Sequence, residues 1–149
     1  MVLRALLVLA VVTVAGVYVV RSVGGPARIA EPAPSHSCGF YYNRNTPVSG
    51  TQRRVNACIV KAAREGRRAR AVAALTTIEG DPIVIYVFVR GRRNILVLYD
   101  STKDDFGERG WTRSRCNRLV VSESFLGSQG CVEIGVGKPS WLEPFELPD

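Results

Sequence analysis

Four cysteines constrain this 149-residue chain more than any other feature of its sequence. They are Cys38, Cys58, Cys116 and Cys131. Their spacings match no compact zinc motif, and an even number of cysteines behind an export-like leader is typical of disulfide bonds. We therefore expect a disulfide-stapled domain that folds in an oxidising compartment outside the cytoplasm.

Three pairings of these cysteines are possible. We favour the sequential one, Cys38 with Cys58 and Cys116 with Cys131, because each bridge then closes a short loop. On the chain-entropy account, a bridge across such a loop adds about 3 kcal/mol to the free energy of unfolding. The alternative is a cytosolic protein with four reduced, structural thiols.

The export-like leader is a hydrophobic run at residues 5–20, which lies between Arg4 and Arg21. The run is longer than the core of a usual signal peptide and shorter than the roughly 20 residues that cross a bilayer. Snorkelling of the two arginines would supply the missing length. Residues 1–23 are thus expected to form a hydrophobic helix, either a signal anchor or a signal peptide. We favour the uncleaved anchor. The chain would then be a single-pass protein of the cell membrane with an extracytoplasmic domain; a cleaved leader would make it secreted.

The rest of the chain divides by composition. Residues 24–37 form a Pro/Gly linker that contains His36, and a lone histidine in a linker is usually solvated. Residues 38–137 are expected to form the stapled domain. Residues 138–149 form a C-terminal tail.

Sequence patterns predict one helix followed by an antiparallel meander. The helix should begin near Ser49, which has capping-box spacing to Gln52, and should end at about Arg64, before Gly66. Strands are expected at residues 70–78, 83–90 and 95–100, with Gly80 at the first corner of a type II′ turn. A fourth is expected within residues 111–121 and a fifth at 131–136. The fold class is therefore α+β, with one helix packed on an antiparallel β-meander of four to five strands.

Both faces of this meander are apolar. In the strand at residues 83–90, for example, both sets of alternating side chains are hydrophobic. Both faces must then be covered. The helix would cover one, and either the tail or a second protein would cover the other; we favour the tail. The apolar residues of the tail are Trp141, Leu142, Phe145 and Leu147.

Antiparallel pairing sorts the charges of this chain, whose net charge is +7, to two ends of the sheet. The basic patch at one end consists of Arg67, Arg68, Arg70, Arg90, Arg92 and Arg93. This patch suits an anionic envelope polymer or lipid headgroups, with a solvated rim of hairpin turns as the alternative. Nucleic acid is not expected as a partner, because no aromatic residues interleave with the arginines.

The acidic group at the other end consists of Glu79, Asp81, Asp100, Asp104 and Asp105. Its carboxylates would suit a carboxylate-based hydrolase or a calcium-stabilised structural module. An EF-hand loop is incomplete, because Trp111 occupies the place of its bidentate glutamate. Turn building by aspartate and glycine is the interpretation that we favour, and no metal site or cofactor is assigned.

The chain contains no G-x-S-x-G elbow, Walker loop or H-E-x-x-H motif. We assign no catalytic residue, leave open whether the protein is an enzyme, and favour a non-enzymatic module that binds a partner or ligand. That partner would be an envelope polymer or another protein.

Two strings of residues carry a resemblance. Thr-Ile-Glu-Gly-Asp-Pro-Ile occupies residues 77–83, and Asp-x-x-x-Asp-x-Phe-Gly occupies residues 100–107. With Cys116 and Cys131 they resemble a family of small, uncharacterised bacterial exported, lipoprotein-like proteins, over roughly residues 55–134. The resemblance implies a location in the bacterial cell envelope, supports a Cys116–Cys131 bridge and implies no activity. The chain departs from the family by lacking an acylated cysteine.

Overall fold

The computed structural model describes residues 36–43, 48–121, 126–143 and 145. These residues all belong to Glu31–Asp149, one of the two units into which the chain divides. The predicted hydrophobic segment at residues 1–23 lies outside the described residues. Within the described ranges, no helix is long and apolar enough to cross a membrane.

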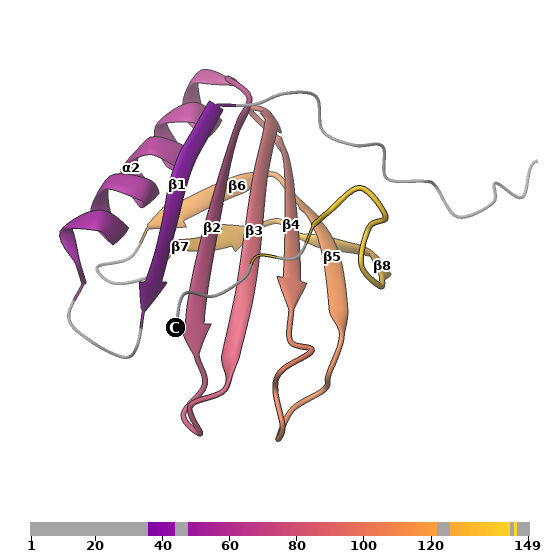
Figure 1. Cartoon of the computed structure of the whole chain (residues 1–149). Coiled ribbons are helices and arrows are strands. Elements are labelled where there is room, and N and C mark those ends of the chain that lie inside the picture. The colour runs from indigo at the N-terminus through magenta and orange to yellow at the C-terminus, as the bar shows by residue number, and fades with distance from the viewer. Residues whose placement is uncertain (1–35, 44–47, 122–125, 144, 146–149) are drawn as a thin grey trace, which may run out of the picture. The chain divides into compact units, whose positions relative to one another are not determined.

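A six-stranded sheet carries the fold (Figure 1). Its strands stand in the order β1 (His36–Asn43), β2 (Ala69–Thr76), β3 (Pro82–Gly91), β4 (Asn94–Asp100), β5 (Trp111–Cys116) and β8 (Val132–Val136). The strands from β2 to β8 pair in antiparallel fashion, whereas β1 pairs in parallel with β2. The predicted α+β class is confirmed: the described residues form one helix and a mostly antiparallel sheet.

The sheet differs from the predicted meander at its first strand. β1 begins at His36, which the sequence placed in the linker, and it adds a sixth, parallel strand at the sheet edge. Parallel neighbours need a long crossover connection, and the helix that follows β1 supplies it.

The expected strand at residues 111–121 is two strands in two different sheets. β5 ends at Cys116, and β6 (Arg118–Val121) pairs only with β7 (Leu126–Gln129) in a hairpin. The chain turns at Asn117, whose side chain lies against Gly130: a Cβ added there would meet the Asn117 amide at 2.3 Å. Gly130 also has a φ of 60°, so the turn requires glycine for both reasons.

The turn between β2 and β3 also differs from expectation. The amide of Gly80 donates to the carbonyl of Thr77 at 3.1 Å, so Gly80 is the last residue of this turn and not the first corner of a type II′ turn. The hydroxyl of Thr77 accepts a hydrogen bond from the amide of Asp81 at 3.0 Å. This side-chain contact fixes the turn at residues 77–80, two residues earlier than the predicted turn at residues 79–82.

The helix α2 (Gly50–Glu65) has the ends that the sequence predicts. The hydroxyl of Ser49 accepts a hydrogen bond from the amide of Gln52 at 3.0 Å. Gly66 closes the helix in the left-handed region, with a φ of 72°. The predicted start of the helix at Ser49 and its predicted end before Gly66 are both confirmed.

α2 packs on one face of the sheet. β2 contributes three buried alanines to this contact, Ala69, Ala71 and Ala73, whose small side chains let the helix approach closely. Ile59 of α2 and Leu119 of β6 belong to the same core, so the β6–β7 hairpin covers this face together with the helix. In Figure 1 the hairpin lies behind the sheet.

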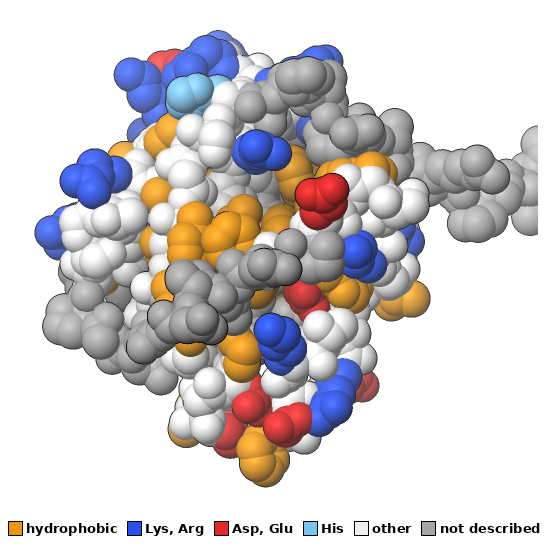
Figure 2. Space-filling model, viewed as in Figure 1, with side chains coloured by type: hydrophobic (Ala, Val, Ile, Leu, Met, Phe, Trp, Pro, Cys, Tyr) orange, Lys and Arg blue, Asp and Glu red, His pale blue; other side chains and the backbone are white. Residues whose placement is uncertain are grey.

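The opposite face is covered in its centre by the tail, as expected. The ring of Trp141 meets Phe88 edge-on at 5.4 Å, and the ring of Phe145 lies 4.3 Å from that of Phe40. The amide of Phe145 also donates to the hydroxyl of Tyr86 at 2.7 Å. Figure 2 shows the hydrophobic side chains gathered in the middle of this face. Leu147 lies outside the described residues.

Both disulfide bonds follow the sequential pairing. Cys38 of β1 is joined to Cys58 of α2, and Cys116 at the end of β5 is joined to Cys131. No cysteine is left free. The first bridge fixes the helix to the sheet edge, and the second closes the base of the β6–β7 hairpin.

Candidate functional site

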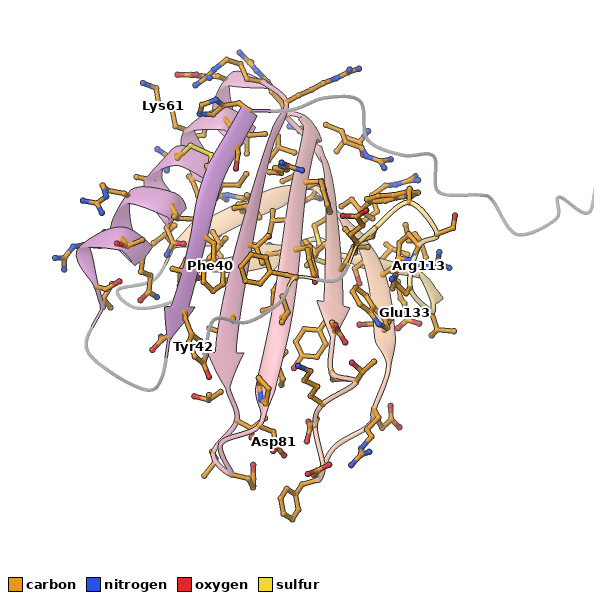
Figure 3. The ribbon with its side chains drawn as sticks, in the orientation of Figure 1. Phe40, Tyr42, Lys61, Asp81, Arg113 and Glu133 are labelled. Atoms are coloured by element: carbon orange, nitrogen blue, oxygen red, sulfur yellow. A yellow bond between two sulfur atoms is a disulfide. The ribbon has the colours of Figure 1, made fainter. Side chains whose placement is uncertain are left out.

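The register of the strands places the two predicted charge clusters at opposite ends of the sheet. Arg70 at the start of β2 pairs with Phe88 near the end of β3, and Arg92 and Arg93 lie in the following turn. Asp81 lies at the other end, as Figure 3 shows. Figure 2 shows acidic side chains gathered at that end and several basic ones at the opposite end. The chain enters the described part of the domain at the basic end, because His36 pairs with Ala69.

The arginines of the basic patch have different surroundings. Arg90 is half-buried, and this burial, with a smaller contribution from nearby Arg115, lowers the pKa of its guanidinium. Arg92 lies across the end of α2, where a Cβ on Gly66 would be 3.0 Å from Arg92 Cγ. Arg67 is bound to Glu65. The arginines of the patch therefore differ in burial and in partners.

Four residues of the acidic group lie in two loops that are tied to each other, and the fifth, Asp100, is the last residue of β4. Asp104 Oδ1 accepts hydrogen bonds from the amides of Phe106 and Gly107, at 3.0 and 2.8 Å. Asp81 Oδ2 accepts one from the amide of Asp105 at 2.9 Å, which links the β2–β3 turn to the loop after β4. Carboxylates used in this way shape turns. The geometry favours the turn-building interpretation over the hydrolase and the calcium module.

Substitution of Asp104 separates these interpretations. We expect Asp104→Ala to lower the free energy of unfolding by about 1 kcal/mol, because two loop amides lose their acceptor. Asp104→Asn keeps an acceptor oxygen, so it should lower the free energy of unfolding by less than about 0.5 kcal/mol. Urea denaturation of both variants measures the difference. A melting temperature that rises with calcium and falls with a chelator would contradict the turn-building interpretation.

A groove between α2 and β6 is a site that the sequence did not predict. Its volume is about 900 Å³. Ala57 and Val60 of α2 and Leu119, Val120 and Val121 of the hairpin supply apolar lining. Five basic side chains also line it, against a single acid, Glu65. The basic residues are Arg53, Lys61, Arg64, Arg92 and Arg118.

A buried polar pair adjoins this groove. Asn56, which is also among the lining residues, is hydrogen-bonded to Tyr41. Since Asn56 Oδ1 has no partner among the described residues, the amide N–H of Asn56 is the donor. Burial raises the pKa of Tyr41, and the hydrogen bond from Asn56 offsets part of that rise. The pair anchors α2 to β1 beside the Cys38–Cys58 bridge.

The signal for one wall of the groove was present in the sequence. Arg53, Ala57 and Arg64 lie on one stripe of the helix surface, at the spacing that aligns side chains along a helix. The other wall is not predictable, because the sequence pattern places Arg118–Val121 at the end of a strand in the main sheet. The groove exists because the chain leaves that sheet at Asn117.

His36, Cys38 and Cys58 form the remaining cluster, with ligand atoms within 4.8 Å of one another. His36 lies in β1 and is exposed. In the bridged state the two sulfur atoms are bonded to each other, so neither is the thiolate that metal binding requires. The cluster is a disulfide with a neighbouring imidazole.

Comparisons of the chain with protein-family models, with curated proteins and with solved structures found no match. The resemblance to exported bacterial proteins stays a prediction. The case for a function therefore depends on the residues themselves.

Proposed function

We propose that the chain is a non-enzymatic, extracytoplasmic module of the bacterial cell envelope that binds a partner and is held at the membrane by its N-terminal segment. The observation that carries this proposal is the position of the two bridges. Cys58 follows Ala57 in one wall of the groove, and Cys116 with Cys131 brackets the hairpin that forms the other wall. Both walls are thus fixed before a partner arrives, which lowers the entropic cost of binding.

The same bridges support the compartment. Disulfides persist in oxidising environments and are rare in the cytosol. The hydrophobic segment at residues 5–20 would deliver the domain to such an environment. Anionic lipid headgroups attract arginine side chains, so the basic end of the sheet suits a domain that works close to a membrane.

Thiol labelling tests the compartment. We expect the full chain from freshly broken cells to take up no maleimide reagent under denaturing conditions, and four equivalents once it has been reduced, one for each cysteine. The same intact-mass measurement reports whether the leader has been removed. Uptake of four equivalents without reduction would overturn the envelope assignment and the stapled fold together.

An activity screen tests the non-enzymatic part. The hydrogen bonds of the acidic group give no support to a hydrolase, so we expect the full chain to release no product from ester, phosphate or glycan substrates. Turnover that is lost in Asp81→Asn while the melting temperature is kept would replace this proposal with the hydrolase.

A further inference from the structure

We infer that the groove between α2 and β6 binds an extended, acidic segment of a partner protein, which adds a strand to the free edge of β6. The inference deepens the proposed function, on which it rests, by naming the class of partner. It is carried by the exposed strand edge, the charge of the groove and its length.

The strand edge follows from the residues that line the groove. All four residues of β6, Arg118–Val121, border it. Successive side chains of a strand point to opposite faces, so a surface bordered by four successive residues lies along the strand's edge. Among the described strands β6 pairs only with β7. Alternate residues of β6 therefore direct backbone N–H and C=O groups towards the groove, a template for an added strand.

The charge of the groove selects an acidic segment. Arg53, Arg92 and Arg118 form no salt bridge within the described residues, and the one lining acid, Glu65, already contacts Lys61 and Arg67. The apolar lining between the cations, formed by Ala57 and Val60, favours a segment that alternates acidic and aliphatic side chains. In a strand of this kind, the acidic side chains point to one face and the aliphatic side chains to the other. A polyanion without apolar groups would leave the apolar lining of the groove uncovered.

The length of the groove fixes the length of the segment. Arg53 and Arg64 are separated by about 16 Å along α2, at 1.5 Å of rise per residue. An extended chain covers that distance in about five residues. We therefore expect a core of about five residues with a carboxylate near each end.

A fluorescent peptide, Glu-Val-Asp-Val-Glu, is the probe for this inference. We expect it to raise fluorescence anisotropy on binding the full chain in an uncharged detergent. A peptide with prolines in place of both valines keeps the charge but loses two backbone donors. Its affinity should be weaker by about tenfold or more. Lys-Val-Lys-Val-Lys should not bind. Equal binding of the acidic and the proline peptides would overturn strand addition.

Groove variants locate the binding site. Arg53→Glu and Arg118→Glu should each weaken binding by about tenfold or more. Arg93→Glu makes the same charge change outside the groove lining and should leave the affinity unchanged. If a glutamate variant does not fold, Arg53→Gln and Arg118→Gln replace it, with an expected weakening of about threefold. An equal loss in Arg93→Glu would show general electrostatic attraction and overturn the inference.

Two further probes separate this inference from the proposed function. If phosphatidylglycerol vesicles or dextran sulfate bind in a manner that depends on Arg53 and Arg118, and the acidic peptide does not, the groove takes a polyanion. That result overturns the peptide site and leaves the envelope module intact. If all four thiols react with maleimide before reduction, the proposed envelope module is overturned, whether or not the acidic peptide binds.

Discussion

Replacing Cys38 and Cys58 together with alanine is expected to lower the free energy of unfolding by about 3 kcal/mol. The bridge spans a sequence separation of 20 and joins α2 to β1, which has β2 as its one neighbour among the described strands. Without it the unfolded chain gains conformations that the bridge now excludes. For a domain of this size the melting temperature should fall by about 10–15 °C. Thermal and urea denaturation of the full chain measure both quantities.

The second bridge provides the matched control. Cys116 is fully buried, whereas Cys131 is exposed, so replacing both with alanine also removes a buried sulfur from the core. We expect a loss somewhat larger than that of the first pair, about 4 kcal/mol. Reductant should destabilise the native chain and leave a variant without cysteines unaffected. A Cys38/Cys58 variant that melts within about 2 °C of the native chain would show that this bridge does not stabilise the fold.

The parts of the fold that were predicted correctly depend on near neighbours in the sequence. Ser49 and Gln52 are three residues apart, and their hydrogen bond starts α2 where the capping pattern placed it. Gly66 ends the helix because it alone in that stretch adopts the left-handed conformation without strain. β2, β3 and β4 are joined by short turns, so their antiparallel register follows from local pattern.

β1 could not be placed in the same way. Its partner β2 begins at Ala69, beyond the whole of α2, and parallel pairing leaves no turn signal between the two strands. Its register is also interrupted beside Cys38, where Gly39 has a φ of 102°. The aromatic residues after Gly39 favour a strand, but nothing local in the sequence indicates which strand they join.

The candidate sites differ in the same way: one kind depends on near neighbours in the sequence, and the other on residues that are far apart in it. The charged ends of the sheet were predictable because each hairpin brings the loops at one end together. The groove was not, because Arg53 and Arg118 line the same groove only after α2 folds back on the sheet and the chain turns away at Asn117. That turn depends on the contact between Asn117 and Gly130, which cannot be predicted from the spacing of residues in the sequence.

Truncation of Ile95 and of Leu98 to alanine should destabilise the protein by similar amounts, each about 3–4 kcal/mol. Both side chains of β4 are fully buried, but they lie on opposite faces of the sheet. Ile95 belongs to the core beneath α2. Leu98 pairs with Tyr86, whose hydroxyl binds the tail at Phe145, so it lies on the face that the tail covers. Urea denaturation curves with a shared slope give the two losses.

Ile78→Ala is the control, because Ile78 is 97% exposed in the β2–β3 turn and the substitution should cost less than about 0.5 kcal/mol. The comparison between Ile95 and Leu98 decides how the second apolar face is used. If the tail stays in place, this face is core, and the groove between α2 and β6 is the surface left for a partner. A cost below about 1 kcal/mol for Leu98→Ala, with the full cost for Ile95→Ala, would mean that the tail leaves in solution. The face marked by Phe40, Tyr86 and Phe88 would then be the docking surface, in place of the groove.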